Sequence, residues 1–323
     1  MNRRIAFIMI LLASALPACL PAAAISVQQD TVPEVPRLNR LPSSVPPNNA
    51  ALRSFERPRA APAARVNSNG FDSGPDADAS PVFVPASAAP WTVAISESQN
   101  LARDFTCAGV LVAPTWVLTA AHCTFNLARR WPRDAEPYVF TETLALDEPG
   151  PRFAIAEVVP HPEYDARTLQ NDLALVRIAV KDMNAGTPLR IEGAPVTSQI
   201  GEIATILGWG ATTSIDKYQH NEQLRLLQVA VVSDGPCAGV NRRRETQRQG
   251  LFCANSLLKH HDVCYRFGGS PLVMYDDSAR LYVAGLVSWP AACPEDHRKP
   301  NTYLDVQHYV PWIKSVIKDG QGP

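Results

Sequence analysis

Short apolar runs rich in Val, Ile, Leu and Ala recur from residue 82 to residue 312, and turn-type segments separate them. Such runs are typical of β-strands, and their spacing is typical of a sandwich or a barrel. The pattern therefore predicts an all-β domain over residues 81–318. The expected strands are PWTVAI, CAGVLVAPTWVLTA, RFAIAEVVPH, DLALVRI, EIATILGWG, LRLLQVAVV, SPLVMY and LYVAGLVSW.

Helical spacing occurs at the end of this region, in VQHYVPWIKSVIK. Val310, Ile313 and Ile317 recur at intervals of three and four residues, which places them on one face of a helix. We expect a C-terminal helix that closes the domain, followed by a short tail over residues 319–323.

The first eighty residues differ from this region in composition and show no pattern of strands. Arg3 and Arg4 precede an apolar run over residues 5–16, and small residues follow as far as Ala24. This is the pattern of an export signal peptide, predicted over residues 1–24. Residues 25–80 are rich in Pro, Ala, Ser, Asn and Arg without a sustained period, which favours a disordered arm. The apolar run is too short to span a bilayer, and no later segment predicts a transmembrane helix.

The cysteines fit an exported chain. One of the seven, Cys19, lies in the leader, and an even set lies beyond residue 100: Cys107, Cys123, Cys237, Cys253, Cys264 and Cys293. Six cysteines in an exported chain favour three disulfides. Cys19 is either removed with the leader or carries a lipid, because LPAC loosely resembles a bacterial lipobox. Pro17 makes that box atypical, so we favour cleavage after Ala24. We expect a secreted or periplasmic protein, with a lipid anchor at Cys19 as the alternative.

The overall composition and net charge argue against some classes of binding partner. Of 323 residues, 46% are hydrophobic and 19% are charged, and the formal net charge is −1. Nothing global therefore points to nucleic acid or to an anionic membrane. The basic patch NRRRETQRQ, residues 241–249, is either a solvated helix face or a contact for an acidic partner. KHHD, residues 259–262, is a weak metal candidate, because two adjacent histidines rarely point to one site. We expect neither a metal nor a cofactor.

One pair of residues suggests catalysis. His122 follows the apolar run VLTAA, and Asp172 opens the run DLALVRI. A His and an Asp at the ends of separate core strands can meet. The carboxylate would then fix the imidazole tautomer and stabilise its protonated form. A lone His beside a cysteine is usually structural, so the context of Asp172 makes His122 a catalytic candidate.

At these residues the chain resembles the trypsin/chymotrypsin family of serine endopeptidases. CAGVLVAPTWVLTAAHC resembles the family's His motif and NDLALVRI its Asp motif, and LGWG, GLVSW and YVPWI follow in the family's order. The resemblance implies two perpendicular six-stranded antiparallel β-barrels with a C-terminal helix and a catalytic cleft between the barrels. It also implies the disulfides Cys107–Cys123, Cys237–Cys253 and Cys264–Cys293.

The chain departs from the family at the nucleophile. The family pattern is Cys-x-Gly-Asp-Ser-Gly-Gly-Pro-Leu, and residues 264–272 read CYRFGGSPL with the same spacing. The serine position therefore falls on Gly268, which offers His122 no hydroxyl to deprotonate. Ser270 stands two residues later, a shift of about 6–7 Å in extended chain. It is the candidate for a displaced nucleophile.

The two residues before Gly268 depart as well. Arg266 stands at the glycine whose N–H, with that of residue 268, helps to form the oxyanion hole, and a Cβ there is expected to turn the N–H away. Phe267 replaces the Asp that receives the new N-terminal ammonium after activation. The segment DADASPVFVPASAA before Pro90 also lacks an N-terminus of the Ile-Val-Gly-Gly type. Both halves of the activation switch are missing.

The substrate-binding positions are mixed. Asp262 matches the pocket-floor Asp that gives a preference for Arg or Lys, or it is a coincidental polar residue before a cysteine. Ser288 and Trp289 represent the strand that binds substrate. Pro290 replaces a glycine whose N–H pairs with substrate, and proline has no N–H. Asn301 stands where a glycine lines the pocket, so its side chain would narrow the pocket and cap Asp262.

Three functions stay open from the sequence. We favour an exported homologue without peptidase activity, with His122 and Asp172 vestigial. It would bind a protein or peptide through the old cleft or the basic patch, or act as a regulator by competing with active relatives. The first alternative is a working endopeptidase that uses Ser270 and prefers Arg or Lys. The second is a structural module that the Pro-rich arm tethers in the cell envelope.

Overall fold

The computed structural model describes residues 66–67, 70–71, 82–83, 86–124, 136–180, 185–213, 223–233, 249–258, 261–288 and 300–320. Several predicted features lie outside the described residues: the leader with Cys19, most of the arm, Cys237, Cys293, Trp289, Pro290, the first two residues of KHHD, and the basic patch except Gln249.

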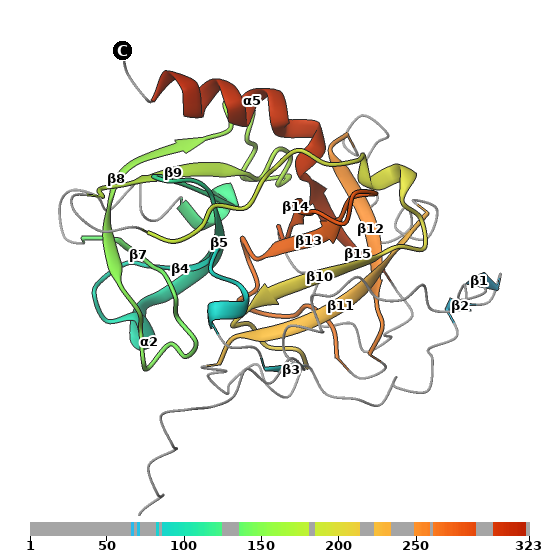
Figure 1. Cartoon of the computed structure of the whole chain (residues 1–323), viewed down its shortest axis with the longest axis horizontal. Coiled ribbons are helices and arrows are strands. Elements are labelled where there is room, and N and C mark those ends of the chain that lie inside the picture. The colour runs from blue at the N-terminus through green and yellow to red at the C-terminus, as the bar shows by residue number, and fades with distance from the viewer. Residues whose placement is uncertain are drawn as a thin grey trace, which may run out of the picture. The chain divides into compact units, whose positions relative to one another are not determined.

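Six strands of the first half of the domain close into an antiparallel barrel (Figure 1). Their order is β4-β5-β6-β9-β8-β7, and β4 pairs with β7 to close the ring. The strands are β4 Thr92–Ser96, β5 Phe105–Ala113, β6 Trp116–Thr119, β7 Tyr138–Phe140, β8 Arg152–Pro160 and β9 Ala174–Ile178. Every residue of β6 is buried, which explains why this strand reads as an unbroken apolar run and not as an alternating one.

The second half forms another six-stranded barrel, in the order β10-β13-β14-β15-β12-β11, closed by the pairing of β10 with β11. A short strand, β3, pairs with Arg225 and Leu226 at the start of β11, outside the part of β11 that pairs with β12. The strands are β3 Val82–Phe83, β10 Ile203–Gly208, β11 Arg225–Val232, β12 Leu251–Ser256, β13 Pro271–Tyr275, β14 Leu281–Leu286 and β15 Asn301–Asp305. All of these pairings are antiparallel.

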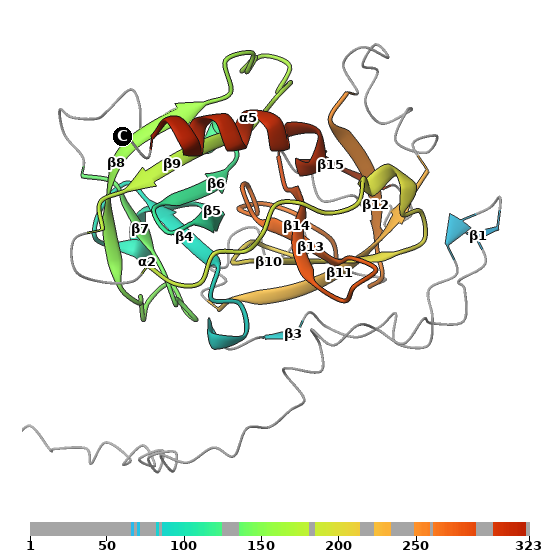
Figure 2. The same ribbon diagram turned by 45° about the horizontal axis from the view of Figure 1, so that its top comes forward.

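Helix α5, Val306–Asp319, packs beside both barrels (Figure 2). It begins at Asp305, whose side chain accepts a hydrogen bond from the Gln307 N–H at 3.0 Å, a normal N-terminal cap. The Gln307 amide donates to the Val283 carbonyl in β14 at 3.0 Å. The Trp312 ring lies 4.9 Å from the His161 ring, next to β8. Ile313 is fully buried, so the predicted apolar face is the one that packs inward.

The remaining described elements are short: β1 Val66–Asn67, β2 Gly70–Phe71, α2 Leu101–Asp104, and the 3₁₀ turns η1 Ala86–Ala88 and η2 Val196–Ser198. None of the described helices is long and apolar enough to cross a membrane. The prediction of two six-stranded antiparallel barrels with a C-terminal helix is confirmed. The apolar pattern missed β7, β12 and β15, because β7 has three residues and the other two contain polar positions.

Candidate active site

The pair His122 and Asp172 lies where the first barrel meets the second. His122 sits on a single helical turn, residues 121–124, just after β6, and Asp172 precedes β9. The ring Nδ1 lies 2.7 Å from Asp172 Oδ2, and the His122 backbone N–H donates to Oδ1 at 2.8 Å. Asp172 is fully buried. These contacts fix the imidazole with Nδ1 toward the carboxylate and Nε2 on the other side of the ring.

The second barrel also holds this carboxylate. Ser288, which follows β14, donates a short hydrogen bond to Asp172 Oδ2. Ala108 in β5 donates its N–H to the carbonyl of Gly268 at 2.9 Å. The two barrels are therefore joined by hydrogen bonds on both sides of the imidazole, and Ser288, predicted to bind substrate, lies against Asp172.

Gly268 is the residue that faces the imidazole. It lies in the loop Tyr265–Ser270, which leads into β13. A Cβ on residue 268 would lie 2.7 Å from His122 Nε2 and 3.2 Å from Cys107 Sγ. The structure thus brings together the predicted His, the predicted Asp and the predicted nucleophile position, and the residue at that position carries no side chain.

Ser270 points elsewhere. Its side chain is fully buried, and within the described residues its Oγ has no hydrogen-bond partner. The Oγ lies against the Cα of Gly208, at the end of β10, where an added Cβ would clash with it. Its backbone is held on both sides, because the Ser270 N–H donates to the Phe267 carbonyl at 2.9 Å and the Ser270 carbonyl accepts from Val287 at 2.9 Å.

Arg266 adopts a left-handed backbone conformation, with φ of 68°. Residue 266 therefore has a backbone conformation that favours glycine although it is an arginine. That the Cβ turns the N–H away stays a prediction. The guanidinium lies over the Phe105 ring, 5.1 Å from its centroid, and donates to the Phe105 carbonyl at 3.4 Å. Burial lowers the pKa of this guanidinium from its ordinary value. Phe105 in turn packs edge-on against Trp209.

Phe267 belongs to the core of the second barrel and is fully buried. Its ring lies against Gly208 and Gly210, in the segment LGWG. A Cβ on Gly208 would come within 2.8 Å of the ring, and one on Gly210 would come closer still. The absence of a side chain at both glycines therefore makes the room that the aromatic ring occupies.

Asp262 and Asn301 lie together inside the second barrel. Asp262 is 1% exposed and Asn301 is 5% exposed. Burial raises the pKa of the Asp262 carboxyl to about 7, while hydrogen bonds from the Val263 N–H and the Asn301 side chain oppose that rise. A carboxyl in this state is about half protonated at neutral pH, so it is a weaker attraction for a cationic side chain than an ordinary Asp.

The remaining candidates are only partly described. In KHHD, His261 Nδ1 lies 3.0 Å from the Thr212 hydroxyl. Cys107 and Cys123 form a disulfide. Cys253 and Cys264 are also disulfide-bonded, and their predicted partners lie outside the described residues.

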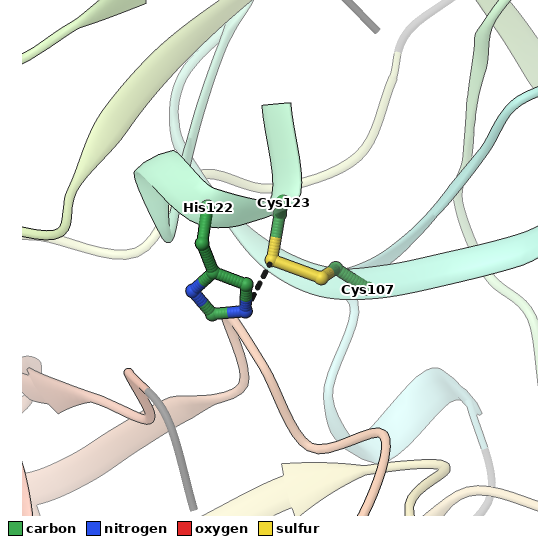
Figure 3. A group of neighbouring side chains, drawn as sticks. All are labelled: Cys107, His122 and Cys123. Carbon is green, nitrogen blue, oxygen red and sulfur yellow. Dashed lines mark hydrogen bonds between the residues drawn. A yellow bond between two sulfur atoms is a disulfide. The ribbon is translucent and has the colours of Figure 1, made fainter. Parts of the chain in front are cut away.

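One cluster of potential metal ligands occurs in the described part of the chain, formed by Cys107, His122 and Cys123 (Figure 3). The two sulfurs in it are joined in the disulfide, and Cys123 Sγ lies 3.5 Å from His122 Nε2. Sequence reasoning pointed neither to this contact nor to Phe105 beside Arg266. A Phe in an apolar strand and a paired cysteine give no signal of either contact.

Two six-stranded barrels that bring a His–Asp pair with a buried carboxylate against the loop before β13 define the class of two-barrel serine endopeptidases. A model of the Trypsin family matches residues 83–313, more than half of the 323 residues. The chain belongs to the trypsin family.

Relatives of established name agree with this assignment. Trypsin from Squalus acanthias is 30% identical over 236 residues, which cover 72% of this chain and 93% of the relative. Coagulation factor XII from Sus scrofa is 32% identical over 244 residues, covering 70% of this chain and 37% of the relative. Urokinase-type plasminogen activator from Gallus gallus is 28% identical over 237 residues, covering 70% and 54%. The matched region is thus only part of the two longer relatives.

Proposed function

We propose that this member of the trypsin family binds a protein or peptide partner and does not cleave it. One observation carries the proposal: a Cβ on residue 268 would lie 2.7 Å from His122 Nε2. Peptide cleavage by a serine nucleophile begins with a hydroxyl that the imidazole deprotonates at this place. Glycine has no hydroxyl, so the His122–Asp172 pair is a base without a nucleophile.

The environment of Ser270 argues against a displaced nucleophile. A nucleophile has to lie within hydrogen-bond reach of its base, about 2.6–3.2 Å. The Ser270 Oγ has no hydrogen-bond partner within the described residues and lies against Gly208. A sliding movement of the loop would have to break the backbone hydrogen bonds from Ser270 to Phe267 and Val287.

Phe267 supports the loss of activation control. The ring fills the core between Gly208 and Gly210, at the position where the family's Asp receives a new N-terminal ammonium. An apolar ring cannot form that ion pair. On this proposal the protein has a single conformation and no inactive precursor form. This suits a protein that acts by binding and needs no activating cleavage.

Export is part of the same proposal. The Cys107–Cys123 disulfide and the bonded states of Cys253 and Cys264 fit an oxidising compartment, because disulfides persist there and are rare in reducing ones. The partner would contact the surface around the barrel junction or the basic patch, residues 241–249.

Labelling with a fluorophosphonate probe tests the loss of peptidase activity, because the probe reacts with an activated serine hydroxyl. We expect no labelling under conditions that label an active trypsin to completion. Ser270→Ala is the matched control. Labelling of the wild type that disappears in Ser270→Ala would establish Ser270 as the nucleophile and overturn the proposal.

Partner capture from the native source tests the binding role. The wild type is compared with a variant in which Arg242, Arg243 and Arg244 are replaced by Gln. A partner lost from the variant assigns binding to the basic patch, and one retained by both assigns it to another surface. A wild-type protein that enriches no partner over a denatured control contradicts a binding function.

A further inference from the structure

The imidazole that lacks a serine is directed at a disulfide. His122 Nε2 lies 3.5 Å from Cys123 Sγ, and the ligand atoms of Cys107, His122 and Cys123 all lie within 4.8 Å of one another (Figure 3). His122 Nδ1 is held by Asp172 at 2.7 Å. The disulfide therefore contacts the imidazole, and the imidazole in turn contacts the carboxylate.

This order is the one that an activated thiol needs. Reactive nucleophiles have a base within hydrogen-bond reach, and a third group orients that base. Thiolates are also stabilised by a nearby imidazolium. In the disulfide form Cys123 has no proton to give. Once the disulfide is reduced, the Cys123 thiol lies beside Nε2, and Asp172 holds the ring in the orientation that this contact requires.

Gly268 packs next to one of the two sulfurs. A Cβ on residue 268 would lie 3.2 Å from Cys107 Sγ, so any larger residue there would cover that atom. The residues Cys107 and Cys123 are otherwise buried, 4% and 1% exposed. Cys107 is thus the less buried of the two and is the sulfur that we take to be attacked, while Cys123 remains next to the imidazole.

We propose that Cys107–Cys123 is a redox-active disulfide, reducible by dithiols, whose reduced form is a Cys123–His122–Asp172 nucleophile site. This inference is independent of the proposed binding function, and it gives the retained His–Asp pair a chemical role.

The reaction balances as a two-electron exchange. A thiolate of the dithiol attacks Cys107 Sγ, the Cys107–Cys123 bond breaks, and its electron pair leaves on Cys123 Sγ. His122 Nε2 takes the proton that the attacking thiol of the reductant loses, and the resulting Nε2–H stabilises the Cys123 thiolate. The second thiol of the reductant then attacks the mixed disulfide, which releases Cys107 as a thiolate that takes a proton. The dithiol is oxidised to a disulfide, and the protein gains two electrons and two protons.

Several titratable or charged groups of the described residues lie near the His122 ring or in the adjoining loop. Asp172 contacts the ring directly. Burial raises the pKa of the Tyr164 and Tyr309 phenols and the charge of Asp172 adds to this rise, so both are neutral at ordinary pH. Arg266 lies two residues before Gly268 in the same loop. A variant at His122 therefore isolates the contribution of this histidine to the pKa of the Cys123 thiol.

The test is the rate of Cys123 alkylation by iodoacetamide in the reduced protein, followed by peptide mass spectrometry from pH 5 to pH 9. An ordinary thiol has a pKa of about 8.5. We expect the wild-type profile to have its midpoint at least one unit lower. His122→Gln should return the midpoint to about 8.5 and slow alkylation at pH 6 by about 10-fold or more. His308→Gln, which removes a histidine on α5, should leave the profile unchanged.

Equal midpoints near 8.5 in the wild type and His122→Gln would overturn the proposal. Cys107→Ser is a second form of the test, because it leaves Cys123 reduced without a reductant and should show the same low midpoint. Folding is followed by circular dichroism in every sample. If dithiothreitol opens the disulfide only as the wild-type protein unfolds, the bond is a structural clamp and the proposal is wrong.

Discussion

The Nε2 atom of His122 lies 2.7 Å from the place that a Cβ on residue 268 would occupy. Real Cβ atoms do not approach a ring nitrogen this closely, so the imidazole stands partly where a serine side chain would begin. The His122 ring can lie at this place because residue 268 has no side chain. The packing around the imidazole therefore suits a residue without a side chain at position 268.

Restoring the serine alone is expected to restore little activity. In Gly268→Ser the ring of His122 has to move, although Asp172 holds it through Nδ1. The prediction that Arg266 turns its N–H away implies a further loss, since one missing donor costs about 10²–10³ in kcat. We expect less than about 0.1% of the kcat/KM of an active trypsin on a fluorogenic Arg peptide.

Gly268→Ala separates the steric effect from the chemical one in this experiment. Its Cβ meets the same ring, so it should lose as much stability as Gly268→Ser while it gains no hydroxyl. A Gly268→Ser variant with activity close to that of an active trypsin would show that the arguments from Arg266 and the imidazole position are wrong.

Arg266 should reveal the cost of its left-handed backbone. Its φ is 68°, and an L-residue in this region is less stable than glycine by roughly 1–2 kcal/mol. Arg266→Gly and Arg266→Ala both lose the contact with Phe105, but only the glycine removes the backbone cost. We expect Arg266→Gly to be more stable than Arg266→Ala by about 1 kcal/mol in urea unfolding. Equal stabilities would mean that the loop relaxes out of this conformation.

Phe267 should behave as a core residue and not as a remnant of a switch. Because the ring is fully buried, Phe267→Ala is expected to lower the free energy of unfolding by about 3–5 kcal/mol. Phe267→Asp, which restores the family residue, should be worse, because it buries a charge without a partner. Ile200→Ala is the control at a 58% exposed side chain and should change stability by about 0.5 kcal/mol or less.

Asp262 should make stability fall as pH rises. Its pKa is raised from 3.8 to about 7 in the folded protein, so between these values the folded state binds a proton that the unfolded state has lost. The resulting stabilisation is complete below about pH 4 and disappears above about pH 7, and is on the order of 4 kcal/mol. Asp262→Asn keeps a neutral side chain throughout.

The difference in unfolding free energy between wild type and Asp262→Asn isolates this effect from other carboxyls, such as Asp104, whose lowered pKa acts in the opposite direction. We expect the difference to shift in favour of the variant by about 4 kcal/mol between pH 4 and pH 8. A difference that does not vary with pH would show that Asp262 is ionised normally.

The strands of both barrels could be predicted largely from local patterns. Runs such as CAGVLVAPTWVLTA and LRLLQVAVV are apolar enough to have one structural solution, and Val310, Ile313 and Ile317 mark the packed face of α5. The short strand β7 and the mixed strands β12 and β15 could not be recognised, because their burial comes from neighbours distant in sequence and not from their own composition.

The candidate site divides in the same way. The sequence by itself predicted which residue occupies the nucleophile position. The number of residues between Cys264 and Pro271 is the same as in the family pattern, so the family's serine aligns with Gly268. It also determined that Ser270 is displaced, since that too is a matter of position along the chain.

Only the tertiary structure decided where these side chains point and what they touch. It turned the Ser270 hydroxyl toward Gly208, laid Arg266 over Phe105, and set His122 Nε2 beside the Cys123 sulfur. Each of these contacts joins residues that are far apart in the sequence or depends on a side-chain rotation. Packing fixes both, and a linear pattern of residue types does not contain either.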